Sequence, residues 1–274
     1  MDRVNCDLLE ETIKIIKHYN LKLKKRWGQS FLVDCNVLEK LVSYVNPCPN
    51  DTILEIGAGI GTVTRELAKR CKKVIAVEID RNLVKVLNEV LKDFSNIELI
   101  ESDILSMKLP RVDKIFSNTP YSISSPLLIK LLKEREYNYA ILTFQREFAD
   151  RLVARPGTPN YGRLTALVSI LAHVEPKDNV SRSSFFPRPE VDSRIVKVIP
   201  RREIPVKDLT LFEYFTSLLF SQRKRTLYSA LKHIKPILVN LLSDKRIKPL
   251  VSKRIYQLEP EELLQLFETF KPFL

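Results

Sequence analysis

Hydrophobic and polar positions in the middle of the chain follow two alternating periods. Between residues 52 and 144, short apolar runs of strand length alternate with segments in which apolar residues recur at helical spacing. Strands that alternate with helices form a parallel sheet covered on both faces, so we predict an α/β, Rossmann-like fold. The predicted strands are Thr52–Ile56, Lys73–Glu78, Ile97–Glu101, Lys114–Ser117 and Tyr139–Phe144, and the predicted helices are Thr62–Arg70, Arg81–Phe94 and Ser125–Glu134.

The segments on either side of this region are mainly helical. A boundary falls near the basic tripeptide Pro200-Arg201-Arg202, and the sequence after it shows only helical spacing. We predict a first domain over residues 1–200, in which residues 1–46 form a helical and basic lead-in, and a small α-helical, basic domain over residues 201–274. The flanking helices are predicted at Leu8–Tyr19, Asn36–Val45, Leu211–Phe220, Thr226–Leu242 and Glu261–Phe270. The segment Arg163–Leu171 is either a helix or an apolar core segment, and β-like runs follow at Ala172–Pro176 and Ile195–Ile199.

The positive charge lies mostly at the two ends. The formal net charge is +12; residues 1–28 carry 7 Lys and Arg against 4 Asp and Glu, and residues 201–274 carry 14 against 8. Basic flanks around a nearly balanced middle indicate a polyanion held by the ends of the chain. A generally lysine-rich surface, as in proteins of heat-loving organisms, remains the alternative.

The cysteines and the hydropathy exclude several classes of protein. Cys6, Cys35, Cys48 and Cys71 form no C-x-x-C pair, and no histidine lies at ligand spacing, so we expect no metal site and no disulfide framework. The chain has no run of about 18 apolar residues and no secretory signal, so we expect no membrane span. A reducing cytoplasm is the expected location.

Residues that can bind a nucleoside follow successive predicted strands. The first strand runs into Gly57-Ala58-Gly59-Ile60-Gly61, where glycines let a ligand approach the backbone at a helix N-terminus. The G-x-G-x-G spacing departs from the dinucleotide fingerprint, and Glu55 before it favours a cationic amino-acid group over a pyrophosphate. Glu78 ends the second strand, where its carboxylate can accept hydrogen bonds from both ribose hydroxyls of an adenosine. Asp103 follows the third strand and can accept from an adenine amino group.

The tetrapeptide Asn118-Thr119-Pro120-Tyr121 closes the fourth strand. The asparagine oxygen can accept a hydrogen bond from an exocyclic N–H, and the tyrosine ring can stack on a base. These residue types also commonly build turns, so the tetrapeptide alone leaves a purely structural role open. The carboxyl ends of parallel strands share one edge of the sheet, which favours a ligand-binding role beside the glycine loop.

With these residues in place, the sequence resembles the ribosomal RNA adenine dimethyltransferases, of the archaeal type, along nearly its whole length. The resemblance includes Gly28-Gln29-Ser30-Phe31-Leu32 and the segment Phe185–Ser193, which is similar to the family's F-x-P-x-P-x-V-x-S. Gln222–Leu227 is similar to its basic segment. Two departures are visible: Thr119 stands where the family usually has Leu or Ile, and Ser30 where Asn or His is common.

The resemblance implies S-adenosylmethionine as cofactor, S-adenosylhomocysteine as product, and no metal. Tyr121 and Phe185 would flank the target adenine. The implied cofactor-binding residues are Gln29, Ser30, Leu32, Gly57, Gly59, Glu78, Ile79, Asp103, Ile104 and Asn118; the implied catalytic residues are Asn118, Pro120, Tyr121 and Phe185; and the candidate RNA-binding residues are Lys24, Lys25, Arg26, Arg223, Lys224 and Arg225.

The implied activity is dimethylation of N6 of two adjacent adenosines in a hairpin loop near the 3′ end of small-subunit (16S) rRNA, linked to small-subunit biogenesis. The implied partner is small-subunit rRNA or the immature small subunit, and we expect a monomer. Two alternatives stay open: an adenine-N6 methyltransferase of large-subunit rRNA, and a non-catalytic ribosome-assembly or RNA-binding factor. Protein glutamine-N5 methyltransferases share a similar Asn-Pro-Pro-Tyr turn, but the F-x-P-x-P segment and the basic tail argue against them.

Overall fold

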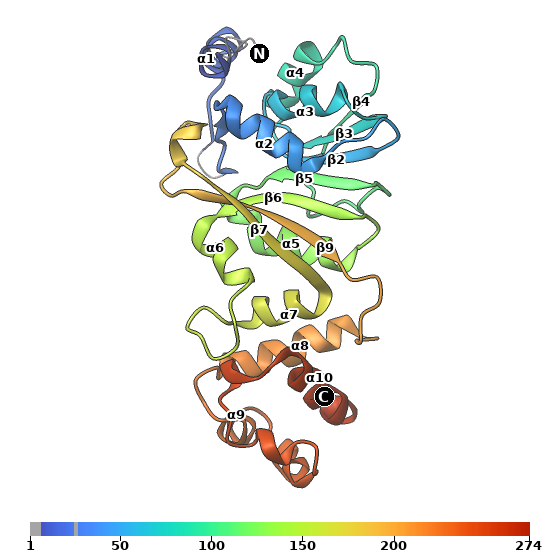
Figure 1. Ribbon diagram of the computed structural model, residues 1–274, viewed down its shortest axis with the longest axis vertical. Coiled ribbons are helices and arrows are strands. Elements are labelled where there is room, and N and C mark those ends of the chain that lie inside the picture. Colours follow the sequence, from blue (N-terminus) through green and yellow to red (C-terminus); the bar gives the residue numbers. More distant parts are fainter. Residues whose placement is uncertain (1–6, 25–26) are drawn as a thin grey trace. The chain divides into compact units, whose positions relative to one another are not determined.

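Residues 7–24 and 27–274, which this computed structural model describes, fold around a seven-stranded sheet with flanking helices (Figure 1). The strand order is β4-β3-β2-β5-β6-β9-β7. The strands are β2 (Thr52–Ile56), β3 (Lys73–Glu78), β4 (Ile97–Glu101), β5 (Lys114–Asn118), β6 (Tyr139–Gln145), β7 (Ala172–Val180) and β9 (Ser193–Pro200).

The sheet is parallel only in part. All pairings among β2, β3, β4, β5 and β6 are parallel, which confirms the Rossmann-like prediction. The β9 strand pairs antiparallel with β6, from Ala140 opposite Val198 to Gln145 opposite Ser193. The sequence predicts no direction for this β-like run, because hydrophobic periodicity identifies a strand but not its direction.

Most helices begin and end close to their predicted bounds. One exception is the predicted helix Thr226–Leu242, which is interrupted before Pro236 because proline lacks an N–H and disfavours helical geometry in the residue before it. The helices are α1 (Leu8–His18), α2 (Cys35–Val45), α3 (Thr62–Ala68), α4 (Arg81–Val90), α5 (Ser124–Lys133), α6 (Arg146–Leu152), α7 (Arg163–Leu171), α8 (Leu209–Ser221), α9 (Leu227–Ile234) and α10 (Pro260–Phe270), with a 3₁₀ segment at Pro236–Ser243.

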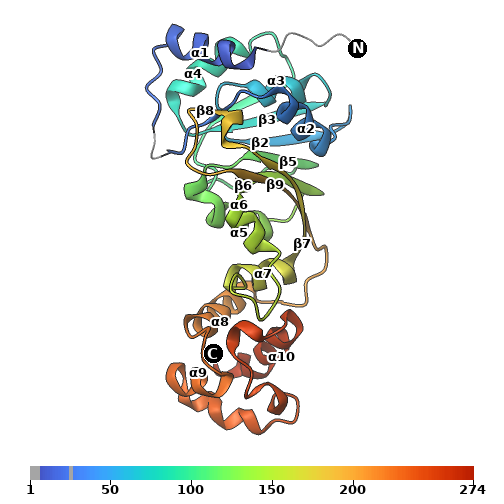
Figure 2. The same cartoon turned by 60° about the vertical axis from the view of Figure 1, so that its left-hand side comes forward.

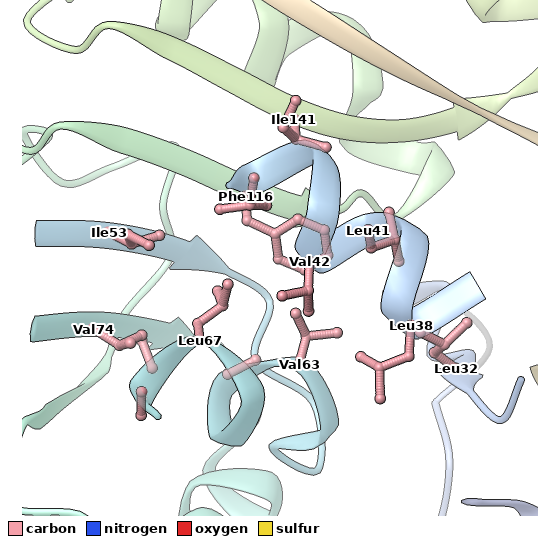
Figure 3. Close-up of a cluster of buried hydrophobic side chains, with 14 of the residues drawn as sticks. Leu32, Leu38, Leu41, Val42, Ile53, Val63, Leu67, Val74, Phe116 and Ile141 are labelled. Atoms are coloured by element: carbon pink, nitrogen blue, oxygen red, sulfur yellow. The ribbon is translucent and has the colours of Figure 1, made fainter. Parts of the chain in front are cut away.

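The α2 helix supplies much of the core on one face of the sheet. Figure 3 shows Val42 of α2 between Phe116 of β5 and Val63 of α3. Alternate strand residues such as Leu54 and Ile115 are also fully buried. Because successive strand residues point to opposite faces, the sheet is covered on both sides. Its carboxyl edge is therefore the part left for binding.

The chain divides into two units whose boundaries differ from the prediction. The first unit runs to Ala149 and resumes at Glu175–Pro200, and the second takes Asp150–Val174 and Arg201–Leu274. One boundary falls at residue 200, as in the predicted division, whereas residues 150–174 belong with the helical unit rather than with the first one. The reason is packing: the Tyr161 hydroxyl donates to the Leu258 carbonyl at 3.0 Å. Figure 2 shows α7 and the C-terminal helices of this unit.

Two short strands connect motifs that are far apart in the sequence. The β1 strand (Phe31–Leu32) pairs antiparallel with β8 (Phe185–Phe186), so that Leu32 lies opposite Phe185. This ladder joins the Gly28–Leu32 motif to the F-x-P segment. Neither strand is predictable from periodicity, because two residues are too few to show one.

The cysteines of the described residues differ in their bonding. Cys35 is disulfide-bonded, whereas Cys48 and Cys71 are free thiols; the sequence predicts no disulfide framework and does not foresee this single bond. Spacing along a sequence does not report distance in space.

In the described part of the chain, no helix combines the length and the apolar content needed to cross a bilayer.

Candidate active site

One cavity of about 350 Å³ opens at the carboxyl edge of the parallel strands. It is bordered by the loop after β2 and by the ends of β3, β4 and β5, as expected for an open α/β sheet. The N-terminal segment from Trp27 to Leu32 forms another wall. All ten predicted cofactor-binding residues line this cavity: Gln29, Ser30, Leu32, Gly57, Gly59, Glu78, Ile79, Asp103, Ile104 and Asn118.

The glycine loop is shaped by close approaches as well as by its dihedral angles. Gly59 has φ +62°, and a Cβ there would lie 3.2 Å from the Phe31 ring. Gly61 has φ +84°, and a Cβ would lie 3.1 Å from Leu91, the residue that follows α4. A side chain at either position would meet both backbone strain and a crowded neighbour. The loop therefore holds β2, α3 and the N-terminal segment close together around the cavity.

Glu78 is a buried carboxylate with one part of its bonding capacity left. Its side chain is 5% exposed and accepts hydrogen bonds from the amide N–H groups of Gly59, Ile79 and Asp80 at 2.9–3.0 Å. Burial raises the pKa of Glu78, and these N–H groups oppose that shift. Two of the three bonds go to Oε1, so Oε2 keeps room for one further donor such as a ribose hydroxyl.

Glu55 lines the same cavity but, unlike Glu78, has a carboxyl oxygen without a hydrogen-bond partner among the described residues. This oxygen is Oε2, and the residue is 2% exposed. Burial raises the pKa of Glu55 to about 8; the Thr64 side chain opposes this shift, and the nearby charge of Glu78 adds to it. A buried acceptor without a donor is costly, so an incoming cation or N–H group would relieve it.

Asn118 has a defined amide orientation. Its Nδ2 donates to the Ser30 carbonyl at 3.3 Å, which assigns the other end of the amide, Oδ1, as the acceptor available to a ligand. Asp103 contributes a second acceptor: Oδ1 accepts from the Leu105 amide, and Oδ2 has no partner among the described residues.

Thr119 faces the protein interior. It is buried, its amide donates to the Thr143 carbonyl at 3.2 Å, and its hydroxyl has no partner among the described residues. The Pro120 carbonyl already accepts from the Ile123 amide. A carbonyl oxygen has two lone pairs, so the carbonyls of Thr119 and Pro120 are both candidates for a second acceptor beside Asn118, although only Pro120 is among the residues that line the cavity. The departure at position 119 changes packing behind the site and leaves the backbone group intact.

The two predicted aromatic residues do not line the cavity, although Pro120 does. The Tyr121 hydroxyl lies 2.8 Å from Ser193 Oγ, which fixes the ring beside the F-x-P segment. Burial raises the pKa of Tyr121, so the phenol stays neutral. Phe185 is buried and packs into the core around Leu32. Phe185 is therefore a core residue in this structure and not part of the cavity wall.

The candidate RNA-binding residues separate into different environments. Lys24 forms an ion pair with Asp80 at 2.9 Å, and Lys25 and Arg26 lie outside the described residues. The Arg223 guanidinium donates to the carbonyls of Thr158, Pro159 and Tyr161, so its hydrogen bonds are internal. Lys224 and Arg225 are exposed just before α9.

The described residues contain no group of His, Cys, Asp or Glu side chains that could hold a metal ion.

Sequence reasoning missed Asp80, which follows Glu78 and Ile79 directly. The signal was present as a second carboxylate two positions after the first, but its partners lie some fifty residues away in the sequence.

Comparison with known proteins connects this cavity to a chemistry. Residues 20–271 match the family described as "Ribosomal RNA adenine dimethylase". The chain belongs to this family. It is thus an S-adenosylmethionine-dependent rRNA adenine dimethyltransferase, which fits a cavity lined by buried carboxylates, a glycine loop and an oriented asparagine amide.

Several known proteins match this chain over most of their own length. A protein of Methanosarcina barkeri named "Probable ribosomal RNA small subunit methyltransferase A" is 41% identical over 92% of this chain and 89% of its own. The solved "dimethyladenosine transferase from Plasmodium falciparum" is 31% identical, with a TM-score of 0.78 over 88% of this chain and 98% of that one. The solved "23S rRNA methyltransferase ErmE" is 30% identical, with a TM-score of 0.65 over 88% and 99%.

Proposed function

We propose that this dimethyltransferase modifies N6 of two adjacent adenosines in a hairpin loop near the 3′ end of small-subunit rRNA, with the immature small subunit as its substrate. Curated relatives named for small-subunit modification support this, since they match at about 40% identity over nearly the whole chain. The large-subunit alternative has a specific observation in its favour, the likeness to ErmE, but at lower identity.

The residues of the cavity fit the proposed cofactor. S-adenosylmethionine, when bound, supplies an electrophilic methyl group on a sulfonium centre. Glu55 offers its unpartnered oxygen to the ammonium of the amino-acid part, and Glu78 Oε2 offers one acceptor to the ribose. Asp103 Oδ2 offers an acceptor to the adenine amino group. Glu55 supports this assignment most directly, because it is buried in the cavity wall and its Oε2 has no hydrogen-bond partner among the described residues, so the ammonium group would supply one.

The single observation that carries the catalytic role of Asn118 is its amide orientation. With Nδ2 held by the Ser30 carbonyl, Oδ1 can accept an N–H of the target amine. The carbonyl of Thr119 or Pro120 can accept the other N–H. Two acceptors draw the N6 lone pair out of conjugation with the ring and aim it for in-line attack, so positioning supplies most of the catalysis.

Little further chemistry is needed from the protein. The proton lost from the methylated nitrogen is strongly acidic, so no strong base is required, and no histidine is among the residues that line the cavity. Tyr121, held at Ser193, would stack on the base, with Phe185 behind the N-terminal wall. A paired target adenine must first leave its helix, at a cost of a few kcal/mol.

The test uses labelled S-adenosylmethionine with undermethylated small subunits, followed by mapping of the label on the rRNA. Label at N6 of two adjacent adenosines near the small-subunit 3′ end is the expected result. Large subunits are incubated in parallel. Label confined to the large-subunit rRNA would transfer the assignment to the alternative.

A further inference from the structure

Asp80 lies at the centre of a hydrogen-bonded group that has no assigned role. It is 2% exposed, and each of its carboxylate oxygens accepts from the N-terminal segment: Oδ1 from Lys24 Nζ at 2.9 Å and Oδ2 from Gln29 Nε2 at 2.7 Å. The Lys24 amide also donates to Gln29 Oε1 at 2.6 Å, which closes the group on itself. Burial alone would raise the pKa of Asp80, but bonds from Lys24 and Gln29 hold it below its ordinary value.

The Lys24 ammonium has two further reasons to stay in this position. It lies 3.9 Å from the centre of the Trp27 ring, a cation–π contact within the same segment. Its partner carboxylate is almost completely buried, so the pair lies where charge attraction is strong. We name Asp80, Lys24 and Gln29 the Asp80 clamp.

The segment held by the clamp continues directly into the contacts of the catalytic amide. Ser30 follows Gln29, and its carbonyl accepts the Asn118 Nδ2–H at 3.3 Å. The Ser30 hydroxyl donates to the Pro187 carbonyl at 2.6 Å, in the F-x-P segment. The clamp thus fixes one side of the Ser30 peptide, and Pro187 fixes the other.

We propose that the Asp80 clamp is a positioning group that holds the Ser30 carbonyl against Asn118 and thereby keeps Asn118 Oδ1 turned toward the target amine. This inference rests on the role proposed above for Asn118. An asparagine amide is nearly symmetric in shape, and without the Ser30 carbonyl it can turn over. The turned amide presents N–H to the N–H of the substrate and blocks the reaction.

Two other roles for these residues give different expectations. Asp80 also caps α4, accepting from the Asn82 amide at 3.1 Å, so it could be a helix cap only. Lys24 could be a phosphate contact only. A cap affects stability, and a phosphate contact affects RNA affinity and its salt dependence. Neither would lower kcat selectively.

The test compares Asp80→Ser and Gln29→Ala with the parent enzyme in steady-state methylation of undermethylated small subunits. Serine keeps the cap of α4 and the backbone N–H to Glu78 but is too short to hold Lys24 and Gln29. We expect each variant to lose about 10- to 100-fold in kcat. The Kd of S-adenosylhomocysteine should stay within about tenfold of the parent, because the Gln29 side chain is directed to Asp80 and to the Lys24 amide although the residue lines the cavity. The double variant should lose no more than the larger single loss, because both changes break one clamp.

The matched control is Asp208→Ser, which changes the aspartate cap of α8 in the same way, at a position that accepts from the Leu211 amide. It should keep the parent kcat. Lys24→Met should lower kcat without changing the salt slope of RNA binding; an unchanged kcat with a shallower slope would instead assign Lys24 to phosphate contact.

Each remaining outcome decides one of the two proposals. Parent kcat in Asp80→Ser and Gln29→Ala, with an inactive Asn118→Ala, would overturn the clamp and leave the catalytic asparagine in place. An active Asn118→Ala would instead overturn the proposed function of that residue. If Asp80→Ser does not fold, Gln29→Ala alone decides. A rise of more than about tenfold in cofactor Kd would make the clamp a wall of the cofactor site rather than a positioning group.

Discussion

The cavity of the first unit and the basic segment of the second unit use their polar groups in opposite ways. In the cavity, Glu55, Glu78 and Asn118 each keep an acceptor that the described protein groups do not fill. In the basic segment, Arg223 directs its guanidinium to internal carbonyls, whereas its neighbours Lys224 and Arg225 stay exposed. A residue type therefore indicates function only when the fold leaves part of its bonding capacity unused.

The most severe test of this comparison removes the acceptor of Asn118. Asn118→Ala deletes the oxygen proposed to accept the target N–H, and we expect methylation to fall by roughly 10³-fold or more. The Kd of S-adenosylmethionine should stay within about tenfold, because other groups hold the cofactor. Single-turnover methylation and calorimetric titration measure the two effects. Near-normal turnover would show that the unused acceptor is not catalytic.

The next test separates the ring of Tyr121 from its hydroxyl. Tyr121→Ala removes the stacking surface, worth about 1–3 kcal/mol per base, and should lower activity by roughly 10- to 100-fold. Tyr121→Phe loses only the bond to Ser193 and should cost about fivefold or less. Methylation rates of the two variants on the same substrate provide the measurement. Equal losses would argue against stacking.

The basic segment gives a prediction within one tripeptide. Arg223→Ala leaves three carbonyls without their donor and should lower Tm by roughly 5 °C, with the salt slope of RNA binding unchanged. Lys224→Ala and Arg225→Ala should keep the parent Tm, and each should reduce that slope by about 1. Thermal unfolding and RNA titrations at several salt concentrations distinguish them. A reversed pattern would mean that exposure does not identify the RNA contacts.

The smallest expected effect concerns Glu55 in the enzyme without ligand. Its pKa rises from an ordinary value of 4.5 to about 8 on folding, so between these pH values the folded state retains a proton that the unfolded state has lost. The free energy of unfolding should therefore fall as pH rises from about 4.5 to about 8. In Glu55→Gln this contribution is absent, so its Tm should exceed that of the parent by a few degrees at pH 8.5 and match it near pH 4.5. Scanning calorimetry across this range is the check, and a pH-independent difference would contradict the assignment.

The sequence predicted those site residues whose position follows from local pattern. Glu78 and Asn118 lie at strand ends, and strand ends of a parallel sheet meet at one edge, so their convergence follows from periodicity alone. The sequence favoured a Glu78 that accepts both ribose hydroxyls, whereas the structure leaves one acceptor site, on Oε2. The difference depends on the amides of Gly59, Ile79 and Asp80, which are set by the turn geometry.

What escaped prediction depends on contacts between distant segments. Arg223 reads as a phosphate-binding residue in a basic run, and only the position of residues 158–161 turns it inward. Asp80 reads as an ordinary helix cap until Lys24 and Gln29 are placed beside it. The burial of Phe185 follows from a two-residue ladder with Leu32 that no periodicity reveals.

The division of the chain at residues 149, 174 and 200 has a consequence for exchanging parts between relatives. The helical unit is assembled from two stretches of sequence, and the segment Asp150–Val174 is enclosed between portions of the catalytic unit. A single crossover at residue 200 would therefore transplant α8 to α10 without Tyr161 and the carbonyls that bind Arg223. A chimera that exchanges the whole helical unit must therefore replace residues 150–174 as well as residues 201–274. A single fusion point cannot replace both stretches.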